Sequence, residues 1–338
     1  MAVLLAANAG FIPTSPLHIV NSELSAIRWG AEELNDRLKD YGYGGIELHW
    51  SNVFKHCRDM RFASPEKAQV LARGVVSAHE SWRGVANPFP FDERRTPLRT
   101  DVPPESLVVK IGSAVLVPTG ARSLNALERL EQKLGRPNTM HYVMFPDEHG
   151  SYRADQEKTM RFPDSSIQPT VDVEACWNAR SPRDFVEELK LRGYKATIDS
   201  FHISRKGKMI DGTSNWQALS ERLLGEGMVR EVHVSVGRND FEKIDPVRYG
   251  QSVAELRALV DNQSLDGTPL GELAGMLNNR NWTGNVVIEA TIPGLSATYG
   301  KMTPNLLGEL HSSMTKGVQQ MLPHIEWQSH FSQQHVVS

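Results

Sequence analysis

The sequence is poor in the features that mark several common classes of protein. Its 338 residues include only two cysteines, Cys57 and Cys176, too few for a disulfide framework or a CxxC zinc pattern. It has no long apolar run. The opening MAVLLAANAGF is apolar, but it is too short to span a membrane and lacks the basic start of a signal peptide. We therefore expect a cytoplasmic protein with no membrane partner.

Neither sign of charge is in surplus. Lysine and arginine number 37 against 40 aspartates and glutamates, which gives a net charge of −3. Nucleic-acid binding depends on a basic surface that neutralises phosphates, so this balance argues against a nucleic-acid partner. The sequence also lacks a P-loop, a GxGxxG turn after a strand and a GxSxG elbow. Nucleotide-binding and serine-hydrolase functions therefore have no motif to support them.

Short apolar runs alternate with amphipathic segments along the chain. Strands are expected at 2–7, 43–49, 75–79, 141–145, 170–174, 195–199, 231–236 and 285–290. Helices are expected between them, among others at 22–42, 64–73, 123–135, 181–194, 214–227 and 304–321. Eight strands alternating with helices predict an α/β protein with a single (β/α)8 TIM barrel over residues 1–327. The barrel would have an enlarged loop after the third strand, residues 81–118, which could act as a lid. Residues 328–338 are expected to form a loose tail.

Polar side chains occur where several of these strands end. In a (β/α)8 barrel the catalytic residues lie at the carboxyl ends of the strands. Alternate strand residues share a face, so Glu231, His233 and Ser235 of the seventh strand lie opposite its valines. The polar residues at or near strand ends are His49, His79, Glu174, Asp199, His233 and Glu289.

Four of these residues come from the fifth to the eighth strand: Glu174, Asp199, His233 and Glu289. A single histidine or aspartate at a strand end is more often a hydrogen-bonded structural residue than a ligand. Four of them on consecutive strands, all facing inward, favour a metal site. Three carboxylates and one imidazole suit a hard divalent cation, manganese or magnesium, with zinc and cobalt as alternatives.

Three further residues lie where they could bind a substrate. Arg238 follows the seventh strand and could bind a phosphate or a carboxylate; the alternative is a solvated loop charge. Trp82 comes three residues after the third strand and could form a wall of the pocket, or it could simply pack. His79 ends the third strand, within reach of a substrate or an extra cation. We assign substrate binding to these three residues.

The order Glu174, Asp199-x-x-His202, His233, Glu289 resembles the xylose isomerase-like TIM barrel superfamily. That group includes sugar and sugar-phosphate isomerases and epimerases, and the apurinic endonuclease-like hydrolases. GYGGIELH (42–49) is similar to its second strand and SAHESW (77–82) to its third, and the resemblance spans about residues 2–322. It implies that the four residues bind one divalent ion, with manganese preferred. It also implies that His202 contacts the substrate or helps to place the metal.

The resemblance implies a metal-dependent isomerase or epimerase of a small sugar, polyol or hydroxy-ketone. Glu174 and Glu289 would act as acid and base through an enediolate. Two alternatives stay open. One is a metal-dependent hydrolase or lyase, such as an endonuclease-like phosphodiesterase or a polyol dehydratase. The other is a sugar-binding barrel without turnover. The loop GRNDFEKIDPVRYG (237–250) lacks the Asp-x-His pair of the three-metal endonucleases. Homo-oligomerisation is left open.

Overall fold

The structure is a computed structural model, and it describes residues 3–8, 31–49, 75–79, 109–111, 114–116, 141–144, 168–173, 181–192, 194–204, 216–238 and 245–328. The strands are β1 Val3–Asn8, β2 Gly45–His49, β3 Val75–His79, β4 Val109–Ile111, β5 Ala114–Leu116, β6 His141–Met144, β7 Gln168–Asp172, β8 Lys195–Asp199, β9 Val229–Val236, β10 Asn285–Ala290 and β11 Trp327–Gln328. The helices are α1 Ala31–Asp40, α7 Pro182–Arg192, α8 Ser200–Ile203, α9 Trp216–Gly225, α10 Pro246–Asp261, α11 Pro269–Asn279, α12 Ile292–Tyr299 and α13 Pro304–Met321.

The main sheet is parallel, and its strands follow one another in the order β1, β2, β3, β6, β7, β8, β9, β10. β10 also pairs with β1, with Leu5 opposite Val286, so the two ends of this order are joined. The α/β class with a parallel sheet is therefore as predicted. The short β11 adds to β1 on the same sheet and includes Gln328, the first residue of the expected tail. The complete eightfold alternation of strands and helices stays a prediction, because the segments after β2, β3 and β6 lie outside the described residues.

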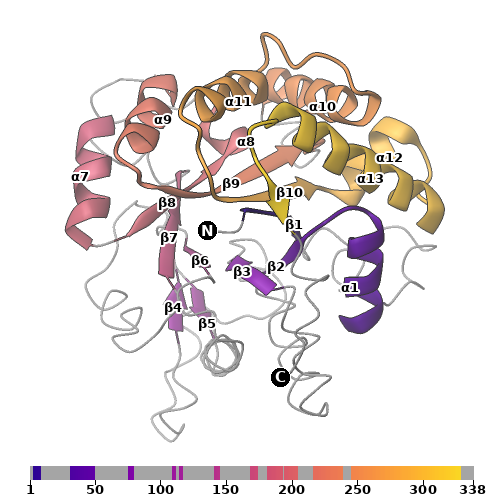
Figure 1. The fold of residues 1–338 in the computed structure, drawn as a ribbon, viewed down its shortest axis with the longest axis horizontal. Helices are drawn as coiled ribbons and strands as arrows, with labels where there is room; N and C mark the ends of the chain where they lie inside the picture. Colours follow the sequence, from indigo (N-terminus) through magenta and orange to yellow (C-terminus); the bar gives the residue numbers. More distant parts are fainter. Residues whose placement is uncertain are drawn as a thin grey trace, which may run out of the picture.

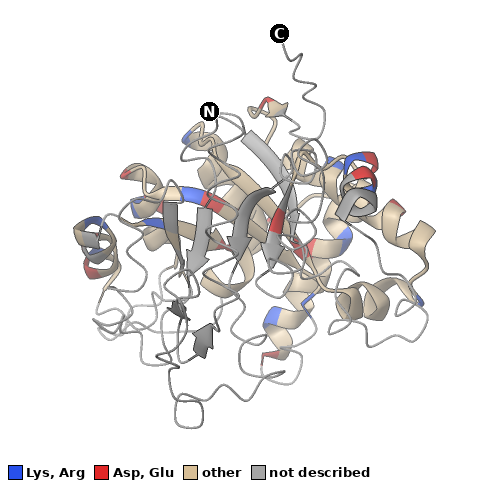
Figure 2. Ribbon diagram, turned by 90° about the horizontal axis from the view of Figure 1, so that it is seen from below, with Lys and Arg blue, Asp and Glu red and all other residues tan. Residues whose placement is uncertain are grey.

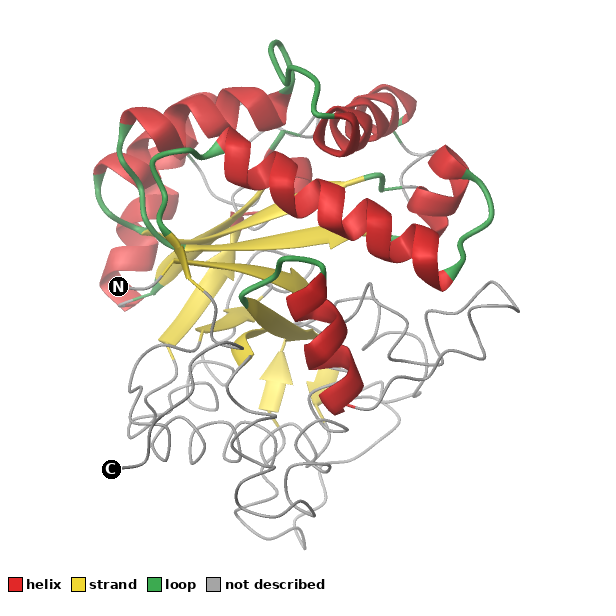
Figure 3. Ribbon diagram, turned by 45° about the vertical axis from the view of Figure 1, so that its right-hand side comes forward, coloured by secondary structure: helices red, strands yellow, loops and turns green. Residues whose placement is uncertain are grey.

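The helices lie on the outer side of the sheet (Figure 1). In Figure 3, α13 runs across the strands and α1 lies beside β2. The core between the two layers is apolar: Leu256 of α10 and Met314 and Val318 of α13 are fully buried, as are Val232 and Val234 of β9. Among the described residues, no helix is long and apolar enough to cross a membrane. Lysine and arginine are interspersed with aspartate and glutamate on the helices (Figure 2).

Four helices begin with the same local signal. An aspartate or threonine accepts a hydrogen bond from the backbone three residues later, and a proline occupies one of the first two helical positions. The capping residues are Asp245, Thr268, Thr291 and Thr303. The last of these helices, α13, has the bounds 304–321 that the sequence predicted. One of them, α12, begins two residues after the end of β10, so the Thr291 cap fixes the direction in which the chain leaves that strand.

Two expectations about the elements needed correction. Part of the 81–118 segment is regular, because β4 and β5 form a small antiparallel ribbon in which Lys110 pairs with Val115. The fifth barrel strand, β7, ends at Asp172 instead of continuing to Glu174. Val173 is the last described residue of this segment, and Glu174 lies outside the described residues.

Candidate functional site

Three neighbouring strands bring polar side chains together at their carboxyl ends. Asp199 of β8 is opposite His233 of β9, and Glu289 of β10 is opposite Ser235, two residues further along β9. These side chains are nearly inaccessible, with exposed fractions of 1% for Asp199, 0% for His233 and 3% for Glu289. One ligand atom from each of these three residues lies within 4.8 Å of the other two. The structure therefore gathers three of the four residues that the sequence proposed as metal ligands.

Asp199 uses its two oxygens differently. Its Oδ1 accepts hydrogen bonds of 2.8 Å from the backbone N–H groups of Phe201 and His202, which makes it the N-cap of α8. Its Oδ2 accepts a 2.6 Å hydrogen bond from the Ser235 hydroxyl. Burial raises the pKa of Asp199, but the charges of His202 and Arg238 outweigh burial and hold that pKa below its usual range. An ionised oxygen of Asp199 thus faces the centre of the cluster.

The Ser235 hydroxyl lies between two acidic oxygens, 2.6 Å from Asp199 Oδ2 and 3.0 Å from Glu289 Oε2. A hydroxyl has one hydrogen and can donate to only one of them. The other oxygen meets the lone pairs of the hydroxyl, and Arg238 Nη1 is 3.5 Å from Glu289 Oε2, which is long for a charge-assisted hydrogen bond. A divalent cation among these oxygens would supply the missing positive charge. The residues present therefore fit a hard cation such as manganese or magnesium.

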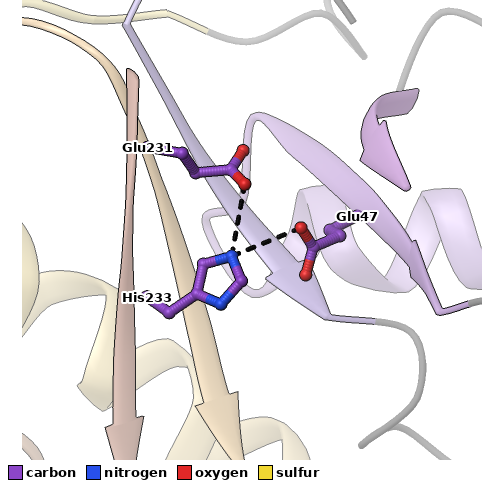
Figure 4. A group of neighbouring side chains, drawn as sticks. All are labelled: Glu47, Glu231 and His233. Carbon is purple, nitrogen blue, oxygen red and sulfur yellow. Dashed lines mark hydrogen bonds and ion pairs between the residues drawn. The ribbon is translucent and has the colours of Figure 1, made fainter. Parts of the chain in front are cut away.

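His233 has carboxylates on both sides of its ring, and Figure 4 shows the side with Glu47 and Glu231. Its Nδ1 is 3.5 Å from Glu289 Oε1, and its Nε2 is 3.2 Å from Glu231 Oε1 and 3.4 Å from Glu47 Oε2. Burial lowers the pKa of His233, but the Glu47 and Glu289 charges and the hydrogen bonds to Glu231 and Glu47 together raise it well above its usual value. Burial raises the pKa of Glu47 to about 7, although the His233 charge opposes this shift. A cation that bound at Nδ1 would displace a proton from the ring.

Two of the predicted substrate-binding residues border this cluster. The His202 ring meets the Phe201 ring edge-on, with 5.6 Å between centroids, and the Arg238 guanidinium lies 5.8 Å from the centroid of the same ring. Both side chains retain 8% exposure, unlike the fully buried His233. A molecule that approached the cluster along them would meet a charged guanidinium and an imidazole. These groups suit the oxygens of a small polar ligand.

The remaining predicted site residues are not placed in the same detail. His79 ends β3 with its backbone in register with His49 and Val143, and its side chain is outside the description. Glu174 and Trp82 lie outside the described residues altogether. Their roles stay predictions.

The sequence interpretation gave no role to Glu47, Glu231 or Ser235. Each of them had a visible signal, because Glu231 and Ser235 share the strand face of His233, and a glutamate inside an apolar run, as in GIELH, is costly to bury without a partner. What the sequence could not provide was the partner of each side chain. That depends on the strand register and on the distance across the sheet interior.

No protein-family model matches the sequence, and no curated protein matches it. Several solved structures resemble the fold. The D-allulose 3-epimerase of Methylomonas sp., solved with D-allulose, is 12% identical, with a TM-score of 0.49 and coverage of 95% of this chain and 97% of that one. An L-ribulose 3-epimerase is 11% identical, with a TM-score of 0.47 and coverage of 96% and 95%. The probable 3-DHS dehydratase AsbF of Bacillus anthracis is 8% identical, with a TM-score of 0.48 and coverage of 94% and 99%.

These structures are two sugar epimerases and a probable dehydratase, which are among the classes of protein that the sequence resemblance named. Identity is 12% or lower and no quoted TM-score exceeds 0.49, so the conclusions below rest on the residues of this chain.

Proposed function

We propose that the chain is a metal-dependent isomerase or epimerase of a small sugar, polyol or related hydroxy-ketone. The observation that supports this most directly is the buried cluster of Asp199, His233 and Glu289, with Arg238 beside Glu289. Burying acidic groups so closely is costly unless a cation or a proton offsets their charge. The donors suit one divalent ion, manganese first, with magnesium, cobalt or zinc as alternatives.

The roles of the residues follow from their positions. Asp199, His233 and Glu289 would hold the ion, with Glu174 as the fourth ligand. The ion would polarise a substrate carbonyl and so acidify the neighbouring C–H bond. Glu174 and Glu289 would be the acid and base, one removing that proton and the other returning a proton to the opposite face of the carbon. Arg238 and His202 would bind and orient substrate oxygens, together with His79 and Trp82.

The proposal also covers the domain organisation of the chain, its location and its partners. Residues 1–328 would form a single (β/α)8 barrel with an enlarged loop after the third strand, and residues 329–338 would form a tail. We propose a cytoplasmic enzyme whose partner is a small sugar or polyol. Homo-oligomerisation stays open.

The first test is the metal content of the purified protein, measured by elemental analysis. We expect about one divalent ion per chain, lost when Asp199→Asn is combined with His233→Gln. His311→Gln is the matched control, because His311 is also a buried histidine but contacts the Tyr43 hydroxyl instead. It should keep the metal. A wild-type protein that takes up no ion on titration would refute the proposal, and near three zinc ions per chain would favour the endonuclease-like alternative.

The second test is exchange of carbon-bound hydrogen with solvent. We would incubate the metal-loaded protein with a panel of ketoses and keto-polyols in deuterated water and follow the substrates by NMR. The proposal predicts deuterium incorporation that Glu289→Gln abolishes while the fold is kept. Release of water with a new ultraviolet chromophore would instead identify a dehydratase. Ligand-induced stabilisation without exchange would identify a binding protein.

A further inference from the structure

The side of His233 that faces away from Asp199 and Glu289 has its own pair of carboxylates, for which the proposed chemistry has no use. His233 Nε2 lies 3.2 Å from Glu231 Oε1 and 3.4 Å from Glu47 Oε2. The three side chains are each 0% exposed. In Figure 4 both carboxylates point at the same ring nitrogen. Burying two carboxylates beside one nitrogen costs free energy of folding, and a functional role of the contact would account for that cost.

The two glutamates reach His233 from different parts of the sheet. Glu231 precedes His233 by two residues on β9, so its carboxylate comes from the same strand face. Glu47 comes from β2, and β10 and β1 lie between β2 and β9 in the strand order. Both backbones are fixed by strand pairing, Glu47 opposite Ser77 and Glu231 opposite Asn285. The ring is therefore held from its own strand and from across the sheet interior.

In a neutral imidazole, a hydrogen on Nε2 leaves Nδ1 with a free lone pair, so the glutamates at Nε2 affect what Nδ1 can bind. The single hydrogen on Nε2 can be donated to Glu231 Oε1, the nearer oxygen, with Glu47 Oε2 beside it, and the neutral ring then has its lone pair on Nδ1. Nδ1 lies 3.5 Å from Glu289 Oε1, on the side of the proposed ion. A histidine that binds a metal through one nitrogen usually donates the other N–H to a carboxylate, which fixes the tautomer and makes the ring a stronger donor.

We propose that Glu231 and Glu47 are positioning residues for the metal centre: they hold the hydrogen on His233 Nε2 and thereby direct the Nδ1 lone pair at the bound cation. The inference rests on the proposed function, since it presupposes a cation at the cluster. Glu231 makes the shorter contact and belongs to the same strand, so its effect should be the larger one. Both residues are 0% exposed, so we expect neither of them to touch the substrate.

The test is a titration of the chelator-treated protein with cobalt chloride, followed by calorimetry and by the visible absorption of bound Co²⁺. Glu231→Gln should weaken Co²⁺ binding by about 10- to 100-fold and Glu47→Gln by about 10-fold, in line with other supporting carboxylates. The absorption bands of bound Co²⁺ should shift in both variants, because the donor strength of His233 changes. A merely structural role would leave both the affinity and the spectrum unchanged.

Tyr43→Phe is the control for a loss of buried polar contact elsewhere. Tyr43 is buried and its hydroxyl lies 2.8 Å from His311 Nδ1, away from the cluster. The variant should lower thermal stability without changing Co²⁺ affinity. If the wild type binds Co²⁺ and both glutamine variants bind it equally well with the same spectrum, the inference is overturned and the proposed function stands. If the wild type binds no divalent ion, both fail.

A second measurement reads the position of the proton in the wild-type protein. In ¹⁵N-histidine-labelled protein loaded with diamagnetic Zn²⁺, long-range ¹H–¹⁵N spectra should show His233 with its proton on Nε2 and none on Nδ1. The His233→Gln spectrum would assign the signal. A proton on Nδ1 in the metal-loaded protein would contradict the inference directly.

Discussion

The buried ion pair between Arg248 and Glu255 allows a test of how α10 supports the short helix α8, which begins at the candidate metal site. Both residues are on α10, and they are 2% and 0% exposed. Arg248 Nη1 is 3.4 Å from both Glu255 oxygens, and Nη2 donates a 2.9 Å hydrogen bond to the Ser200 carbonyl at the start of α8. The guanidinium also lies 4.8 Å from the centroid of the Phe201 ring. The pair thus ties α10 to the short helix that Asp199 caps.

Arg248→Met would remove the guanidinium and leave the buried Glu255 with its 3.0 Å hydrogen bond from the Leu270 N–H. Burial already raises the pKa of Glu255, and the Arg248 charge opposes that shift. Removing one member of a buried pair typically costs about 3–5 kcal/mol, because the other charge loses its compensation. We expect a loss of that size in the free energy of unfolding.

The assay is urea unfolding followed by circular dichroism at neutral pH, on Arg248→Met, Glu255→Gln and the double variant. The double variant should lose about 1–3 kcal/mol less than the sum of the singles, because it leaves no buried charge behind. Arg280→Met is the matched control: its 2.8 Å ion pair with Glu221 is about half exposed and should contribute less than about 1 kcal/mol. A cost below about 1 kcal/mol for Arg248→Met, or strict additivity, would refute the reasoning.

Three further predictions concern capping, pH and backbone packing. Asp199→Asn should keep the free energy of unfolding within about 1 kcal/mol, since asparagine caps as well as aspartate, whereas Asp199→Ala should lose about 1–2 kcal/mol; equal losses in urea unfolding would argue against the cap. Burial lowers the pKa of His311 to about 4, so the unfolded chain binds more protons than the folded one between pH 4 and 6.5. Its contribution of about 3 kcal/mol is present above pH 6.5 and is lost as the pH falls through this window. His311→Gln should flatten that part of the stability profile, and an unchanged profile would contradict the assignment. Gly294→Ala would place a Cβ 1.5 Å from the Gly237 carbonyl oxygen and should cost about 3 kcal/mol or more in urea unfolding. Gly275→Ala in α11 meets nothing within 4 Å and should stabilise by about 0.5–1 kcal/mol, so a similar outcome for the two variants would count against the packing argument.

The elements of the fold were the most predictable part of the molecule. The eight parallel strands stand out because buried strands are apolar runs of limited length, and α13 stands out because a threonine and a proline mark its start. The β4–β5 ribbon was not predicted, since three-residue strands are too short to show an alternating pattern. α8 was missed for a related reason: one helical turn has no periodicity, and only the hydrogen bonds to Asp199 reveal it.

Some residues of the candidate site could be predicted from the sequence and others could not. Strand parity and strand ends were enough to propose Asp199, His233 and Glu289, because the carboxyl ends of neighbouring parallel strands meet. The same parity placed Glu231 on the face of His233 but could not tell whether its carboxylate turns toward the ring. Glu47 was out of reach of such reasoning, because its approach to His233 depends on how β2 and β9 face each other across the sheet interior.

The pairing of β1 with β10 has a consequence for how the protein is made. Leu5 and Val286 are strand partners but are separated by about 280 residues, so at about 5–20 residues per second β1 waits roughly 15–60 s on the ribosome for that partner. During this time one edge of β1 presents unpaired backbone groups that can join another nascent chain. Pairing of strands so far apart in sequence is intrinsically slow. Until β10 emerges, this edge of β1 therefore lacks its partner strand, and a product truncated before residue 285 would never gain it.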